Sequence, residues 1–142
     1  MQTDTREIDI ISLISEKNSQ LRKLCENQWN AGQHVKITST EWYVLSQLYN
    51  AEPSVSQVAK SVNITRQATH KCLRSLQEKG LLKIVIRPHN KRNRFIVLTP
   101  YGNQCWAEYS TIKKQLEEQI ALTIGADNVN LIKEHFSKDW CC

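Results

Sequence analysis

Residues 54–98 read SVSQVAKSVNITRQATHKCLRSLQEKGLLKIVIRPHNKRNRFIVL and contain two helix starts followed by two β-rich runs. Ser54 and Gln57 have the spacing of a capping box, in which each side chain bonds the backbone amide of the other residue. We therefore expect a short helix to begin after Ser54. A short turn follows, and Thr65 is the expected N-cap of a second helix that runs to about Lys79.

This second helix has two distinct faces. Gly80 stands where the helix should end, since glycine readily takes the left-handed conformation of a C-terminal cap. At about 100° per residue, the polar side chains gather on one arc of the helix. That arc holds Arg66, Gln67, His70, Lys71 and Arg74. The opposite arc, expected to be buried, holds Ala68, Thr69, Cys72, Leu73 and Leu76.

Two short runs after Gly80 are rich in β-branched and aromatic residues. Residues 81–88 read LLKIVIRP and residues 94–98 read RFIVL, which predicts two strands. Residues 89–93 between them are polar and contain the asparagines that turns favour. We therefore predict a β-hairpin with a basic tip, whose cations are Arg87, Lys91, Arg92 and Arg94.

Helical patterns flank this segment on both sides. Residues 8–29 have apolar side chains at helical spacing and would span about 33 Å, which is longer than one small core needs. Part of that apolar stripe is therefore expected to meet a partner chain. Residues 38–41 form another capping box, and its helix must stop before Pro53. Two more helices are expected over residues 100–124 and from about residue 127.

The charge of the chain is unevenly placed. The net charge of the 142 residues is +5, but residues 38–104 carry ten basic and three acidic side chains, or +7, which leaves −2 for the flanks. A positive segment of this kind suits a polyanion. Neither an apolar run long enough to span a membrane nor a secretory h-region is present, so we expect a cytoplasmic protein that does not enter the membrane.

Two capped helices joined by a short turn and followed by a basic hairpin indicate a winged helix-turn-helix. In this arrangement the second helix enters the major groove of duplex DNA, where Arg, Lys and Gln pair with base edges. The hairpin, or wing, then contacts phosphates or the adjacent minor groove. The candidate recognition-helix residues are Thr65, Arg66, Gln67, His70, Lys71 and Arg74, and the candidate wing residues are Arg87, Asn90, Lys91, Arg92 and Arg94.

Several short motifs, taken in their order along the chain, resemble those of the MarR (multiple antibiotic resistance regulator) family of transcription factors. They cover about half of the chain, and the order of the elements matches over nearly all of it. The matching motifs are Ile37-Thr38 with Trp42 and Leu45, Val58-Ala59, Leu76-Gln77-Glu78-Lys79-Gly80-Leu81, and Leu98-Thr99-Pro100-Tyr101-Gly102.

The resemblance implies a mainly α fold with a small β-hairpin wing, in one domain spanning residues 1–142. Residues 1–36 would form an N-terminal dimerisation helix, residues 37–99 the winged DNA-binding lobe, and residues 100–142 the C-terminal dimerisation helices. It also implies a homodimer that binds a pseudo-palindromic operator in double-stranded DNA and represses genes near its own. Family wings usually carry Asp-x-Arg; here Arg92 matches but Asn90 replaces the aspartate, which makes this wing more positive.

The family releases DNA on binding a small, often aromatic, ligand or on oxidation of a cysteine. Trp29, Trp42, Trp106 and Tyr109 are the candidate effector crevice, with ordinary core packing as the alternative. The odd count of five cysteines indicates free thiols in a reducing compartment. Cys72 and Cys105 fit the core better than a redox sensor, and Cys25 lies toward the end of the first helix, whereas the peroxide-sensing branch of the resembled family has its reactive cysteine near the beginning of that helix. The Cys141-Cys142 pair lies in a terminal tail.

The sequence contains no motif that indicates an enzymatic or metal-dependent function. The four histidines, His34, His70, His89 and His135, have no ligand spacing, and no catalytic signature is present, so we expect a non-enzyme without cofactor or metal. The leading hypothesis is a ligand-responsive, DNA-binding repressor. Two alternatives stay open: a winged-helix module that binds RNA or an acidic protein, and a repressor that senses oxidants through cysteine.

Overall fold

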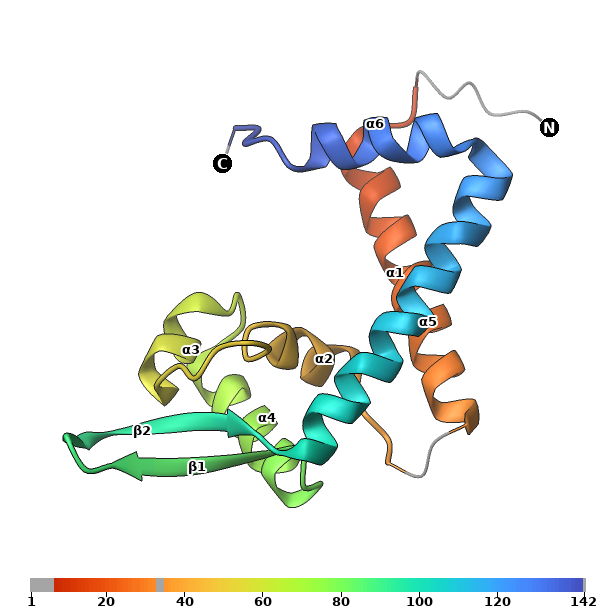
Figure 1. The fold of residues 1–142 in the computed structure, drawn as a ribbon. Coiled ribbons are helices and arrows are strands. Elements are labelled where there is room, and N and C mark those ends of the chain that lie inside the picture. The colour runs from red at the N-terminus through yellow and green to blue at the C-terminus, as the bar shows by residue number, and fades with distance from the viewer. Residues whose placement is uncertain (1–6, 33–34, 142) are drawn as a thin grey trace.

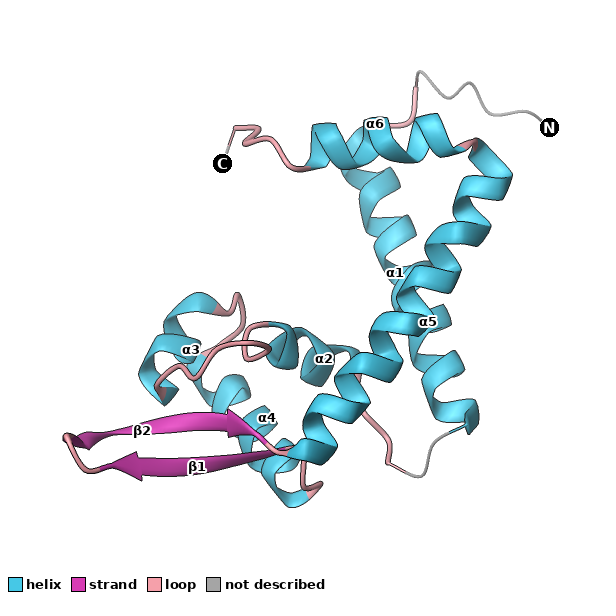
Figure 2. Ribbon diagram, viewed as in Figure 1, coloured by secondary structure: helices cyan, strands magenta, loops and turns pink. Residues whose placement is uncertain are grey.

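The computed structural model describes residues 7–32 and 35–141 and, within them, contains helices and one two-stranded antiparallel sheet (Figures 1 and 2). In chain order the elements are α1 (Ile10–Gly32), α2 (Ser39–Ser46), α3 (Val55–Ser61), α4 (Arg66–Glu78), β1 (Leu82–Arg87), β2 (Asn90–Leu98), α5 (Pro100–Ile124) and α6 (Ala126–Phe136). The predicted mainly α fold with a hairpin wing is confirmed.

The helices are arranged around the long α5. Its first turns lie beside the base of the hairpin, and its middle packs against α1 (Figure 1). At its far end the chain turns back into α6, which packs against α5. Helices α2, α3 and α4 and the hairpin gather at the opposite end, so α5 joins the two groups of elements.

The core lies where α2 and α4 meet α1, α5 and the base of the hairpin. Its largest buried side chains come from every one of these elements, which explains why the winged part packs as one unit with the start of α5. In contrast, α6 has no buried residue in the single chain. The fully buried side chains of the core include Trp29, Leu45, Leu48, Leu73, Leu76, Leu81 and Ile96.

The predicted helix starts are confirmed by their hydrogen bonds. The capping box of α2 has both of its bonds, with Thr38 Oγ1 accepting from the Glu41 amide at 3.1 Å and Glu41 Oε1 accepting from the Thr38 amide at 3.0 Å. The Ser54 and Gln57 pair does the same for α3. Each cap satisfies amides that the first turn of a helix leaves unpaired.

The hairpin differs from its prediction. Residues 89–93 were expected to form a loop, but Arg87 pairs with Asn90, so only Pro88 and His89 remain at the tip. The register is irregular between Ile86 and Arg87, because Ile86 pairs with Arg94. The polar composition of residues 90–93 therefore gave the wrong boundary, since strand pairing depends on the backbone of the partner strand.

The observed helix ends also differ from the predicted ones, by only a few residues. The first helix ends at Gly32 rather than at residue 29, and α2 ends at Ser46, so that Leu48 and Tyr49 lie in the turn that follows it. No described helix has both the length and the apolar character that a membrane span needs.

Two glycines of the predicted family motifs have clear physical reasons. Gly80 follows α4 with φ of +80°, a conformation that other residues rarely adopt. Gly102 lies against the backbone of Leu81, and a Cβ at that position would overlap the Leu81 carbonyl oxygen. The Thr99 amide also bonds this carbonyl, at 3.0 Å, so the start of α5 is held directly against the end of the recognition segment.

Candidate nucleic-acid interface and ligand pocket

The polar arc of α4 points outward, as predicted. Thr65 caps the helix by accepting a hydrogen bond from the Ala68 amide at 3.0 Å. Thr69, Leu73 and Leu76 are buried on the inner side. The five polar side chains of the predicted outer arc are all exposed: Arg66, Gln67, His70, Lys71 and Arg74.

The C-terminal half of α4 is held to α2 through Glu41. The Glu41 carboxylate is buried and accepts hydrogen bonds from Ser75 Oγ, at 2.9 Å, and from Lys79 Nζ. Burial by itself raises the pKa of Glu41, but the bonds from Lys79, the Thr38 amide and Ser75 outweigh it and hold this pKa below its ordinary value. The carboxylate therefore stays charged and fixes α4 to α2.

The wing presents most of its predicted cations to solvent, with one exception. Lys91, Arg92 and Arg94 are exposed on β2. Arg87 instead forms an ion pair with Glu52, and its guanidinium lies 4.2 Å from the centre of the Phe95 ring. Its side chain thus fastens the wing to the segment between α2 and α3, so its orientation here does not favour the predicted phosphate contact.

A second backbone contact supports the wing at the same place. The Ile96 amide donates to the Pro53 carbonyl at 2.9 Å, and Ser54 forms an isolated bridge with Phe95. Near the tip, Asn90 Oδ1 accepts from the Asn93 amide at 3.3 Å. The Asn90 side chain therefore bonds locally, to the backbone at the start of β2.

The four predicted crevice aromatics lie together, but in different roles. Trp42 stacks on Tyr109 with ring centres 3.8 Å apart, and Trp106 lies 6.2 Å from Trp42. Trp29 packs edge-on against Trp42 and is only 1% exposed. Trp29 Nε1 donates to the Val35 carbonyl at 2.9 Å. With its ring buried and its only donor paired, Trp29 is part of the core behind the crevice and does not line it.

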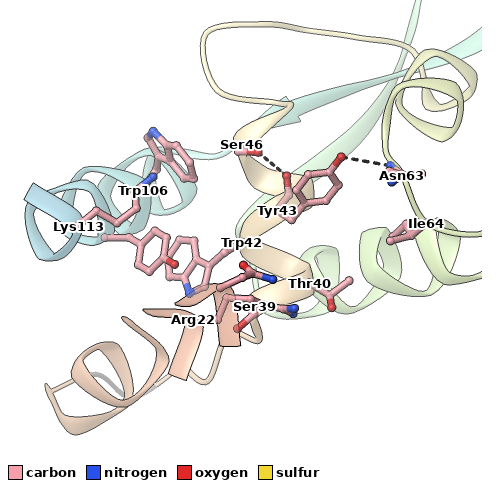
Figure 3. A pocket seen from close by; sticks show the side chains of 12 residues that line it. Arg22, Ser39, Thr40, Trp42, Tyr43, Ser46, Asn63, Ile64, Trp106 and Lys113 are labelled. Atoms are coloured by element: carbon pink, nitrogen blue, oxygen red, sulfur yellow. Dashed lines mark hydrogen bonds between the residues drawn. The ribbon is translucent and has the colours of Figure 1, made fainter. Parts of the chain in front are cut away.

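The other three aromatics line an open pocket of about 460 Å³ between α1, α2 and α5 (Figure 3). Arg22 and Lys113 bring positive charge to it, and Lys113 Nζ lies 4.7 Å from the centre of the Trp106 ring. Trp42 Nε1 is buried and has no hydrogen-bond partner among the described residues. The lining residues that sequence reasoning missed are Asn18, Arg22, Ser39, Thr40, Tyr43, Ser46, Asn63, Ile64 and Lys113.

The cysteines show little of what a thiol sensor needs. Burial raises the pKa of Cys72 and of Cys105, which disfavours the reactive thiolate in both. Cys25 is buried near Tyr109, whose own pKa is raised by burial and by Cys25. Cys141 is exposed, whereas Cys142 and His34 lie outside the described residues. Within the described part of the chain, no group of side chains could hold a metal ion.

An outward amphipathic helix with a hairpin beside it defines the winged-helix class. Residues 36–93 match the MarR family. Similar folds include the reduced form of MarR from E. coli, which is 21% identical with a TM-score of 0.78 over 91% of this chain and 94% of that one. The MepR–DNA complex of S. aureus is 17% identical, with a TM-score of 0.74 over 92% of this chain and 95% of that chain.

A third similar structure is a mutant of E. coli MarR in complex with operator DNA. It is 19% identical, with a TM-score of 0.75 over 96% of each chain. At such identities these structures establish the fold, and the family match covers the winged lobe itself. The chain therefore has a winged-helix fold, and its residues 36–93 are similar to the MarR family.

Proposed function

We propose that this chain is a non-enzymatic, sequence-specific DNA-binding transcriptional regulator. The observation that carries the proposal is the common exposure of the polar arc of α4 and of Lys91, Arg92 and Arg94 on the neighbouring wing. A helix of this kind reads base edges in the major groove, while the cations of the wing bind phosphates. Similar folds of MarR and MepR have been determined with DNA, which supports the same role here.

The regulator is proposed to act as a homodimer. Helix α6 buries none of its residues within the single chain, and several large apolar side chains on α1, α5 and α6 face solvent. We propose that a second copy covers them; to bind successive major grooves of a pseudo-palindromic site, the two copies of α4 must lie about 34 Å apart. The exposed side chains on these helices include Ile10, Ile11, Leu13, Leu122, Leu131, Ile132 and Phe136, and Trp140 after α6 is exposed as well.

The pocket is proposed to bind a small anionic aromatic ligand that weakens DNA binding and relieves repression. Trp42 and Trp106 offer ring surfaces, and Arg22 and Lys113 offer positive charge. The fluorescent acid 2-naphthoate combines a ring and a carboxylate and is a suitable probe. Lys113→Ala should weaken its binding several-fold, whereas Lys114→Ala, at an exposed neighbouring position of α5, should not.

DNA binding is tested by titrating the promoter region of the protein's own gene, followed by fluorescence anisotropy at several salt concentrations. We expect the promoter to bind about a thousandfold or more tightly than random duplex of equal length at the same salt. Lys114→Ala, which removes an exposed cation of α5 and leaves α4 and the wing unchanged, should bind the promoter like the wild type. Binding to the promoter that is no tighter than to random duplex would contradict the proposal and would favour an RNA or protein partner.

A further inference from the structure

Tyr43 belongs both to the pocket and to the helix-turn-helix. Its side chain projects from α2, is 38% exposed and lines the pocket. Its hydroxyl accepts a hydrogen bond from the backbone amide of Asn63 at 3.2 Å, drawn as a dashed line in Figure 3. A molecule in the pocket would therefore meet the ring of Tyr43 while the hydroxyl of the same residue holds Asn63.

Asn63 occupies a sensitive position. It lies in the turn that joins α3 to α4, two residues before the N-cap Thr65, and the Arg66 and Gln67 side chains follow in the first turn of α4. Asn63 and Ile64 themselves also line the pocket. The turn that sets the start of the recognition helix is thus part of the pocket wall.

The two ends of α4 are held to α2 in different ways. At the C-terminal end the buried Glu41 carboxylate binds Ser75 and Lys79. Near the N-terminal end the hydrogen bond of Tyr43 to Asn63 is single and solvent-exposed. A helix fixed firmly at one end and weakly at the other moves most at the weak end, which here carries the side chains expected to read bases.

We propose that Tyr43 transmits occupancy of the pocket to the recognition helix. A ligand that packs against the Tyr43 ring displaces the hydroxyl from the Asn63 amide, and the turn and first residues of α4 then shift while the Glu41 end stays in place. The ligand favours this shifted state because it binds that state more tightly than the one with the bond intact. The proposal rests on the proposed ligand-responsive DNA binding.

The test compares Tyr43→Phe with the wild type and with Tyr49→Phe. The first substitution keeps the aromatic ring in the pocket and removes only the hydroxyl. Tyr49 is also exposed and near the end of α2, but it does not line the pocket and its hydroxyl pairs with no described residue. Amide hydrogen exchange of residues 62–67 and operator affinity are measured for each protein, with and without saturating 2-naphthoate.

In the wild type, 2-naphthoate should speed exchange of the Asn63 amide and weaken operator binding at least fivefold. In Tyr43→Phe the exchange should already be fast without probe, operator binding should be about fivefold weaker, and the probe should change either quantity less than twofold. Tyr49→Phe should behave like the wild type. Binding of 2-naphthoate is followed by tryptophan quenching and should be several-fold tighter in Tyr43→Phe, which already populates the shifted state, and unchanged in Tyr49→Phe.

Several results would overturn the proposal. They are failure of 2-naphthoate to bind, binding that leaves Asn63 exchange in the wild type unchanged, and a full probe response in Tyr43→Phe. The exchange measurement needs no DNA, so it decides the role of Tyr43 even where operator binding fails. Failure of the wild type to prefer its promoter over random duplex, with the exchange results as expected, would instead contradict the proposed DNA-binding function.

Discussion

The carboxylate of Glu41 on α2 accepts hydrogen bonds from Nζ of Lys79, at 2.8 Å and 3.0 Å to its two oxygens. The two residues are 38 positions apart in the sequence. Glu41 also caps its own helix by accepting from the Thr38 amide. One buried carboxylate thus caps the N-terminus of α2 and bonds Lys79 at the C-terminal end of the recognition helix α4.

Replacing Glu41 with Gln should destabilise the protein by about 2 kcal/mol, because the bonds from Lys79 and Ser75 lose their charged acceptor. Chemical denaturation at neutral pH measures this difference. Glu117→Gln is the matched control, since Glu117 pairs with Lys133 on the surface and should contribute less than about 1 kcal/mol. Equal losses of unfolding free energy in the two variants would show that the buried Glu41 contacts stabilise the protein no more than a surface ion pair does.

The same carboxylate should make stability depend on pH. The pKa of folded Glu41 is lower than its ordinary value of 4.5, so the folded state favours the charged form. Its contribution is complete above the unfolded pKa and is lost as pH falls from there through the lower folded pKa. Between pH 5 and pH 3, unfolding free energy should therefore fall less steeply in Glu41→Gln than in the wild type.

Arg92→Ala and Gln67→Ala should affect DNA binding in different ways. Loss of Arg92 removes a phosphate contact, so binding should weaken on all sequences and the slope of log affinity against log salt should shrink by about 1. Loss of Gln67 should instead alter preference at particular base pairs, with about 1 to 3 kcal/mol of discrimination lost there. Anisotropy titrations over a panel of single-base operator variants measure both. Wild-type affinity in Arg92→Ala would mean that the wing is wrongly assigned.

Gly102→Ala should destabilise the protein by about 3 kcal/mol, because the new methyl group overlaps the backbone carbonyl of Leu81 and neither segment can move freely. Gly32→Ala is the control: among the described residues no atom lies within 4 Å of a Cβ at that position, so little change is expected. Thermal and chemical denaturation compare the two. A stable Gly102→Ala variant would show that α5 can shift away from residue 81.

Leu131→Glu should shift the protein from dimer to monomer. Leu131 is 50% exposed on α6, and a charge there could not be buried against a second copy without a partner. Sedimentation velocity over a range of concentrations measures the change, with Asn130→Glu, at an exposed polar position of the same helix, as control. If Leu131→Glu dimerises like the wild type, this face of α6 lies outside the interface.

Much of the fold could be predicted from local sequence. The capping residues Thr38, Ser54 and Thr65 marked three helix starts, and the periodicity of residues 66–76 separated the exposed arc of α4 from the buried one. These signals are reliable because hydrogen bonds and side-chain spacing within one turn of helix depend on neighbouring residues. The hairpin tip was misplaced, since strand pairing joins two segments.

The candidate site was predicted only in part. Of the aromatic side chains lining the pocket, Trp42, Trp106 and Tyr109 were foreseen and Tyr43 was not. The cations Arg22 and Lys113 were also missed, because they look like ordinary surface residues in an amphipathic pattern. Trp29 was expected at the crevice, yet it is enclosed by the core. No feature near Arg87 in the sequence indicates that it pairs with Glu52 rather than facing outward.

By itself, then, the sequence determined the elements, their polar and apolar faces, and the positive charge of the winged segment. Only the tertiary structure decided which polar groups meet: Glu41 with Lys79, Tyr43 with Asn63, and Arg87 with Glu52. The physical reason is range. Caps and amphipathic faces arise from interactions within a few residues, whereas these pairs join residues at least twenty positions apart and exist only once the helices and the hairpin have packed.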